Sequence, residues 1–242
     1  PILVGSLIGI NLFSVDIQNF GLLTPLLIMS FIMVAAIIFA FLFLPSGNTK
    51  ISKNIGVRPV LDKNLKFLLA IGVIVFTSFA MVQSVTAYYL QDKFLLTLNE
   101  TAKSTAIALG SMAAMSIVSQ LTIVQRFKGS PLRLIAWSIP LFILSALVIS
   151  LSYDFTGVLV GMSLMGLGMG LATPGYTAAA SLNADPNNQG AAVGMSMVAP
   201  GIGFALGPLL SGFLYQANLI FPFLFTIPLF LAAFFLIFQL EN

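Results

Sequence analysis

The chain has 242 residues, of which 59% are apolar and only 7% are charged, whereas a soluble domain carries charge on roughly a quarter of its residues. This composition excludes water as the main solvent and predicts a membrane protein. Because the chain contains no Cys and no His, disulfides, thiolate nucleophiles and a histidine proton relay are excluded as well. The net charge of +3 comes from basic residues in predicted membrane loops, so we expect no nucleic-acid partner.

Long uncharged segments are the main structural signal. A helix needs roughly twenty apolar residues to cross the hydrocarbon core, and a charge left inside that core is costly. Open sheet edges cannot exist in lipid, and a β-barrel would show short segments of alternating polarity. The sequence therefore predicts an all-α integral membrane protein. Its expected complete spans are 21–44, 67–91, 104–124, 134–152, 156–181, 190–215 and 219–239.

The chain opens at Pro1 on an apolar segment, 2–13, that is too short to span a membrane. No basic region precedes this segment and no cleavage-like site follows it, which is not typical of a signal peptide. We expect residues 1–13 to be the second half of a helix whose first half, with further helices, lies upstream.

The longest polar segment is 45–66, which carries Pro45 and Pro59 and is typical of a linker between domains. We therefore expect residues 1–44 to end one helical bundle, with half of its fifth helix and its sixth helix. Residues 67–242 then form a complete bundle of six helices.

The basic residues favour one orientation in the membrane. If the linker is cytoplasmic, eight of the ten Lys and Arg residues lie in inside loops, and only Lys93 and Lys103 lie outside. Cytoplasmic loops carry an excess of basic residues. We expect a multi-pass protein of the cell inner (plasma) membrane with a cytoplasmic carboxy terminus.

An internal repeat relates the start of the chain to its end. Residues 1–7, PILVGSL, align with residues 208–214, PLLSGFL, and share a proline, two leucines and a glycine at the same spacing. An even number of helices separates the two copies, so they run in the same direction, as in a parallel duplication of six-helix halves. Chance recurrence of Pro and Gly in helices rich in both is the alternative.

Residues 203–212, GFALGPLLSG, resemble the antiporter motif of the major facilitator superfamily, g-x-x-x-G-P-x-x-G-G, with Ser211 in place of the first closing glycine. Residues 1–5 resemble the end of the same motif in the fifth helix of drug exporters, with Val4 in place of a glycine. The resemblance implies a twelve-helix drug:proton antiporter of which this chain holds helices five, in part, through twelve. Small residues in the motif allow close helix contact and proline bends the helix, so the motif would form a hinge. The implied hinge residues are Pro1, Gly5, Gly203, Gly207, Pro208 and Gly212.

Residues 125–133, QRFKGSPLR, resemble the family's cytoplasmic loop motif, D-R-x-G-R-R. Gln125 stands at the acidic position, so the charge relay of that motif is not reproduced here. A basic loop required by topology alone explains the same residues.

The resemblance also implies a substrate cavity near mid-membrane, lined by the first, second, fourth and fifth helices of each half. Helical spacing places Phe76, Phe79, Gln83 and Thr86 on one stripe of the span 67–91, and Gln83 is strongly polar there. A structural hydrogen bond of Gln83 is the alternative to ligand contact.

In the span 156–181, methionines recur at steps of three or four residues and are followed by two hydroxyl side chains. Such a flexible surface suits varied apolar ligands, and ordinary packing is the alternative. The cavity residues that we expect are Phe79, Gln83, Thr86, Met165, Met169, Thr173 and Tyr176.

No acidic residue lies inside any predicted span, and a proton-coupled exporter needs a titratable group in its pathway. We therefore expect the proton-carrying residue to lie upstream of this chain. The sequence predicts proton-coupled export of drug-like amphipathic compounds by a monomer in the lipid bilayer. The alternatives are a major facilitator transporter of a specific metabolite, such as a sugar or organic anion, and a membrane scaffold without transport activity.

An enzyme is not expected, because the spans offer no nucleophile with a base, no metal ligands and no paired acids. For the same reason we expect no metal and no cofactor. The expected partners are a small-molecule substrate and protons as the coupling ion.

Overall fold

The structure is a computed structural model that describes residues 23–43, 63–182 and 189–241. Every regular element in these ranges is helical. The elements are α3 (Leu23–Phe43), α4 (Lys63–Phe94), α5 (Leu98–Thr122), the 3₁₀ helix η1 (Val124–Arg126), α6 (Pro131–Leu151), α7 (Phe155–Leu182), α8 (Gln189–Ala217) and α9 (Phe221–Glu241). Six helices, α4 to α9, are long and apolar enough to cross a membrane. The prediction of an all-α membrane bundle is confirmed.

The start of α5 differs from the prediction, which placed it at residue 104. The helix begins at Leu98 because Thr97 and Glu100 form a capping box. The Thr97 side chain accepts from the Glu100 backbone, and the Glu100 carboxylate accepts from the Thr97 N–H at 2.9 Å. The spacing of Thr97 and Glu100 is the sequence signal for this start.

The turn between α8 and α9 lies where the sequence placed it. The Asn218 N–H donates to the Leu214 carbonyl at 3.1 Å and so caps the end of α8. The Asn218 side-chain oxygen accepts from the Ile220 N–H at 3.0 Å. Asparagine favours turns because its side chain bonds backbone groups nearby in this way.

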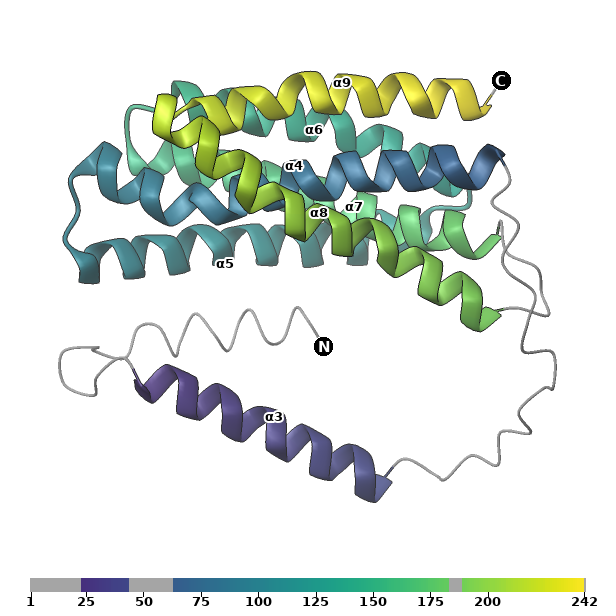
Figure 1. Ribbon diagram of the computed structural model, residues 1–242, viewed down its shortest axis with the longest axis horizontal. Helices are drawn as coiled ribbons and strands as arrows, with labels where there is room; N and C mark the ends of the chain where they lie inside the picture. Colours follow the sequence, from purple (N-terminus) through teal and green to yellow (C-terminus); the bar gives the residue numbers. More distant parts are fainter. Residues whose placement is uncertain (1–22, 44–62, 183–188, 242) are drawn as a thin grey trace.

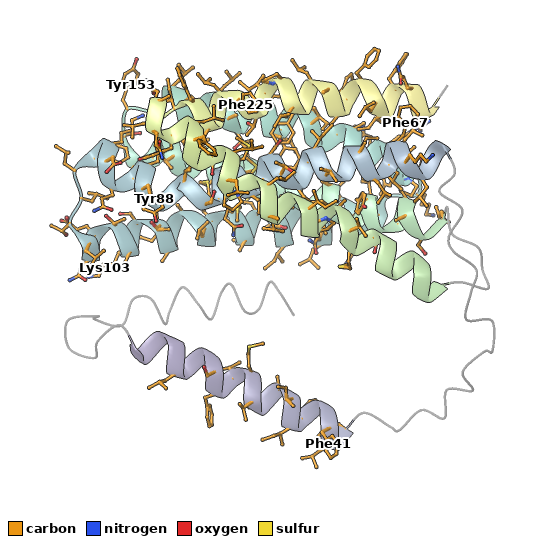
Figure 2. All side chains as sticks on the ribbon, in the orientation of Figure 1. Phe41, Phe67, Tyr88, Lys103, Tyr153 and Phe225 are labelled. Atoms are coloured by element: carbon orange, nitrogen blue, oxygen red, sulfur yellow. The ribbon has the colours of Figure 1, made fainter. Side chains whose placement is uncertain are left out.

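The six long helices form one bundle with α4 and α7 at its centre (Figure 1). Helix α7 packs against α6 and α5, and α4 packs against α8 and α9. Helix α8 crosses α4 obliquely, while α6 and α9 lie together along one edge of the bundle. Tyr153 and Lys103 mark one end of the bundle, and Phe67 marks the other (Figure 2). We call these the Tyr153 end and the Phe67 end.

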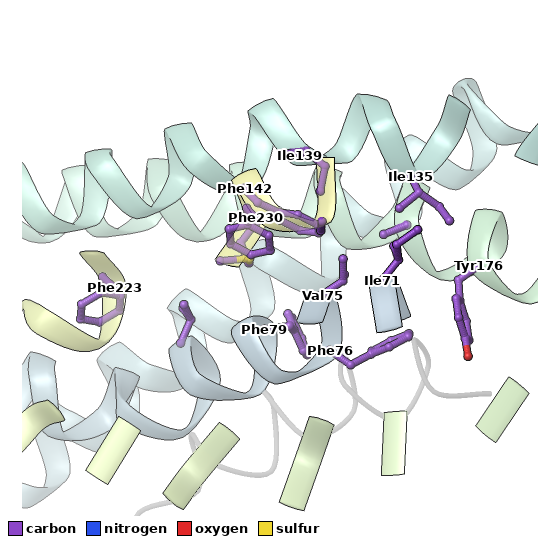
Figure 3. Close-up of a cluster of buried hydrophobic side chains, with 14 of the residues drawn as sticks. Ile71, Val75, Phe76, Phe79, Ile135, Ile139, Phe142, Tyr176, Phe223 and Phe230 are labelled. Atoms are coloured by element: carbon purple, nitrogen blue, oxygen red, sulfur yellow. The ribbon is translucent and has the colours of Figure 1, made fainter. Parts of the chain in front are cut away.

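Aromatic and branched side chains from α4, α6, α7 and α9 fill the interior (Figure 3). Phe142 of α6 and Phe230 of α9 stack with their ring centroids 4.7 Å apart. The Ser145 hydroxyl of α6 donates to the Gly161 carbonyl of α7 at 2.7 Å. In lipid, helices associate through such close packing and interhelical hydrogen bonds rather than through exclusion of water.

Helix α3 lies apart from the bundle (Figure 1). Its side chains are exposed wherever the structure describes them, among them Phe31 at 76% and Phe41 at 89%. The predicted linker 45–66 lies almost wholly outside the described residues, so the division into two bundles stays a prediction.

Candidate functional site

Two glycines bring α8 into backbone contact with α4. A side-chain carbon placed on Gly203 would lie 2.7 Å from the backbone of Phe76 and Thr77. One placed on Gly207 would lie 2.9 Å from the Met81 nitrogen. Both distances are shorter than real carbon contacts, so the two helices can approach this closely only because these positions carry no side chain.

Ser211 continues the contact made by the two glycines. It lies four residues beyond Gly207, on the same face of α8, and its hydroxyl oxygen lies 2.9 Å from that of Ser84. Gly212 faces elsewhere: it is exposed, and a carbon added there would meet nothing within 4 Å. We call Gly203, Gly207, Ser211 and the residues they touch on α4 the α4–α8 seam.

The other predicted hinge residues have different surroundings. Pro208 lies inside α8 with an exposed ring, and its missing N–H leaves the carbonyl four residues earlier without its helical partner. Pro1 and Gly5 lie outside the described residues. Motion at the seam stays a prediction.

On α4, the predicted cavity residues point in different directions. Phe79 is buried and meets Phe204 of α8 edge-on, with ring centroids 6.1 Å apart. Thr86 is buried and its hydroxyl donates to the Val82 carbonyl at 2.7 Å, so that donor is used within the helix. Gln83 alone of the three is exposed, and its amide has no hydrogen-bond partner in the part of the chain that is described.

On α7, the predicted residues run from the core to a partly open face. Met165 is fully buried among the core residues, whereas Met169 and Thr173 are half-buried. Tyr176 is only 2% exposed, and its hydroxyl has no hydrogen-bond partner among the described residues. An unpartnered hydroxyl in the interior costs free energy unless a ligand or water satisfies it.

An aromatic contact joins α7 to α4 at Tyr176. Its ring meets Phe76 edge-on with centroids 5.6 Å apart, and Figure 3 shows Phe76 between Tyr176 and Phe79. Gly72 makes room for the tyrosine, since a carbon added there would lie 2.8 Å from the ring carbon Cζ. Gly72 was not among the residues predicted from the sequence, although a lone glycine in a membrane span is a signal of such close contact.

A polar group at the Tyr153 end was also missed. The Tyr215 hydroxyl of α8 donates to the Asp92 carboxylate of α4 at 2.7 Å. Lys93, the residue after Asp92, donates from its ammonium to the Tyr89 hydroxyl one turn earlier in α4, at 2.6 Å. The Tyr89 hydroxyl in turn donates to the Ile149 carbonyl of α6 at 2.7 Å. Tyr215 and Asp92, and likewise Tyr89 and Ile149, are far apart in sequence, so no local pattern predicts their bonds. Lys93 and Tyr89 are four residues apart on α4.

Comparison with known families identifies the bundle. The family described as Major Facilitator Superfamily matches residues 68–242, which is more than half of the chain and covers the spans from α4 to α9. Comparison with curated proteins gives no match. The chain therefore belongs to the Major Facilitator Superfamily, a family of multi-pass membrane proteins that carry out secondary transport of small molecules.

Proposed function

We propose that this chain serves proton-coupled export of drug-like amphipathic compounds. The observation that carries the proposal is the absence of charge from the middle of each of the six spans of the described bundle. Between Phe67 and Gln91 of α4, and between Phe155 and Leu182 of α7, no Lys, Arg, Asp or Glu occurs. A transporter of organic anions needs basic side chains along its pathway to offset the cost of a buried anion, and this half offers none.

The polar groups that remain suit a mostly apolar ligand with one or two hydrogen-bonding groups. Gln83 presents an exposed amide, and Tyr176 presents a hydroxyl without a partner among the described residues. Met169 and Thr173 are half-buried on the same helix as Tyr176. Methionine adapts to ligands of varied shape, which suits a transporter of several substrates. In the conformation described, the buried side chains of Met165, Phe79 and Thr86 would lie beneath this surface and support it.

The alternative is transport of one metabolite, such as a sugar. A sugar needs many directed hydrogen bonds, whereas Thr86 satisfies its hydroxyl within its own helix. The predicted cavity residues therefore offer few free hydrogen-bonding groups for a sugar, and this favours the amphipathic substrate.

We place the proton-carrying group outside this bundle. The acids whose side chains are described, Asp92, Glu100 and Asp154, all lie at helix ends or loops of the Tyr153 end. None occupies the middle of a span, where a coupling carboxyl is needed. We further propose a monomer in the inner membrane. The distribution of basic residues supports a cytoplasmic carboxy terminus.

The test is accumulation of a fluorescent cationic dye in cells that express the longest reading frame containing this chain. Dye levels are measured with and without an uncoupler that collapses the proton gradient. We expect lower dye accumulation than in control cells, and a rise to the control level once the gradient is collapsed. Unchanged accumulation across a varied dye panel, with the protein shown to be in the membrane, would contradict drug export and favour a specific metabolite.

A further inference from the structure

We propose that the Phe67 end of α6 binds the headgroup of an anionic phospholipid from the surrounding bilayer. The surface consists of Arg133 and Trp137 on α6, with Arg126, Phe127 and Lys128 from the preceding loop. We call these five residues the headgroup surface. The proposal is independent of the transported substrate.

The exposed residues of α6 form one continuous stripe. They recur at steps of three or four residues, which places them on one face of the helix. They are Arg133, Trp137, Pro140, Leu144, Leu147 and Leu151. The other face of α6 packs on α7 and α9. The stripe is therefore apolar over most of its length and becomes cationic at one end, which is the polarity of a phospholipid lying along the helix.

Trp137 marks the level of the membrane surface. It lies six residues after the first residue of α6, which is about 9 Å along the helix axis. Its side chain is 51% exposed, and its ring meets Phe127 of the loop edge-on with centroids 5.2 Å apart. Tryptophan favours the boundary between headgroups and acyl chains because its ring is apolar while its N–H is polar.

The basic side chains beside Trp137 have no acidic partner among the described residues. Arg126, Lys128 and Arg133 are all exposed, and none forms an ion pair in the part of the chain that is described. The acids with described side chains lie at the opposite end of the bundle. The first turn of α6 contains no acidic residue, and the Ser130 side chain makes no capping hydrogen bond. Basic residues next to a span attract anionic lipids, so both the charge and the apolar stripe fit the same ligand.

A lipid explains the surface better than other occupants. A soluble phosphate would use the cations and leave the leucines of the stripe uncovered. A second copy of the chain would have to bring carboxylates to three exposed cations, and the acids with described side chains lie at the far end of the bundle. Only an anionic amphiphile uses both parts of the stripe.

The chain contains one tryptophan, which makes its fluorescence a direct probe of this surface. The 242-residue chain is reconstituted in phosphatidylcholine vesicles that contain a small fraction of brominated lipid. Bromine quenches tryptophan on contact, and the brominated lipid is either phosphatidylglycerol or phosphatidylcholine with the same acyl chains. We expect brominated phosphatidylglycerol to quench Trp137 at a several-fold lower fraction than brominated phosphatidylcholine.

Two variants locate the effect. Arg133→Gln combined with Lys128→Gln should bring the two quenching curves together. Lys103→Gln, an exposed basic residue at the Tyr153 end, should leave the preference unchanged. Circular dichroism of each variant shows whether its helices are intact, so a folding defect is recognised separately.

Equal quenching by the two lipids in the unmodified chain would overturn the proposal. Persistence of the preference in Arg133→Gln/Lys128→Gln would overturn it as well, because the selectivity would then come from elsewhere. Soluble glycerol phosphate provides the last control. If it abolishes the preference at millimolar concentration, the surface binds a free anion rather than a lipid.

Discussion

The hydroxyl oxygens of Ser84 and Ser211 lie 2.9 Å apart across the crossing of α4 and α8. Ser211 stands where the antiporter motif of the family has its first closing glycine. Because Gly203, Gly207 and Ser211 are four residues apart, they share one face of α8. The serine keeps the close approach that the glycines establish and adds a hydrogen bond to it. In this chain the α4–α8 seam therefore combines close packing with a hydrogen bond between the two helices.

A larger side chain at Gly207 should force the seam open. Gly207→Leu would place carbon atoms against Ala80 and the Met81 backbone, which are already in contact with the glycine. Overpacking of this kind costs about 1–3 kcal/mol. We expect a lower midpoint in thermal unfolding of the detergent-solubilised protein, followed by circular dichroism.

Gly212→Leu is the matched control for this change. It makes the same substitution in the same helix, where nothing lies within 4 Å of an added carbon. Its midpoint should stay close to that of the unmodified chain. A similar loss in both variants would mean that leucine disturbs α8 itself, and not the contact with α4.

The serine hydrogen bond should be measurable as a coupling energy. Ser84→Ala, Ser211→Ala and the double variant form a double-mutant cycle. Interhelical hydrogen bonds in membrane proteins average about 0.6 kcal/mol and reach about 1.7 kcal/mol, so we expect a coupling in this range. The free energy of unfolding is measured by titration with a denaturing detergent, and additive single effects would show that the hydroxyls do not interact.

The helices could be predicted from the sequence because each one corresponds to a continuous run of mostly uncharged residues. The direction in which each side chain faces could not be predicted in the same way. Thr86 and Met165 are buried, while Gln83, three residues before Thr86, is exposed. These spans are apolar all round, so they lack the polar face that fixes the orientation of a helix in a soluble protein.

The contacts between helices were partly predictable. The motif around Gly203 and Gly207 indicated that another helix approaches α8 closely, because small residues four positions apart let two helix backbones come into contact. The partner helix was not indicated. Ser84 and Ser211 are 127 residues apart, and Asp92 and Tyr215 are 123 apart, so their pairing depends on the crossing of α4 and α8.

The bond between Tyr215 and Asp92 should hold the Tyr153 ends of α4 and α8 together. We expect Tyr215→Phe and Asp92→Ala each to lower stability by about 1 kcal/mol or less, because Asp92 is exposed and water competes for its carboxylate. For a bundle of this size, 1 kcal/mol corresponds to roughly 2–4 °C in the unfolding midpoint. Since both changes remove the same bond, the double variant should lose no more than either single one.

Tyr153→Phe removes a hydroxyl at the same end of the bundle, where the side chain is 96% exposed. It should leave the midpoint unchanged. A double variant that loses the sum of the two single losses would show that Tyr215 and Asp92 act separately.

The amide of Gln83 and the hydroxyl of Tyr176 provide the most direct test of the proposed transport face. Gln83→Leu and Tyr176→Phe remove hydrogen-bonding groups that have no partner among the described residues, so neither change breaks a hydrogen bond that the structure describes. If these groups contact substrate, dye export should fall several-fold while the amount of protein in the membrane stays constant. Gln239→Leu on α9 and Tyr153→Phe repeat the same chemical changes at exposed positions outside α4 and α7, and both should export dye normally. Two results would contradict substrate contact at Gln83 and Tyr176. One is loss of export in the control variants, and the other is full export in both Gln83→Leu and Tyr176→Phe.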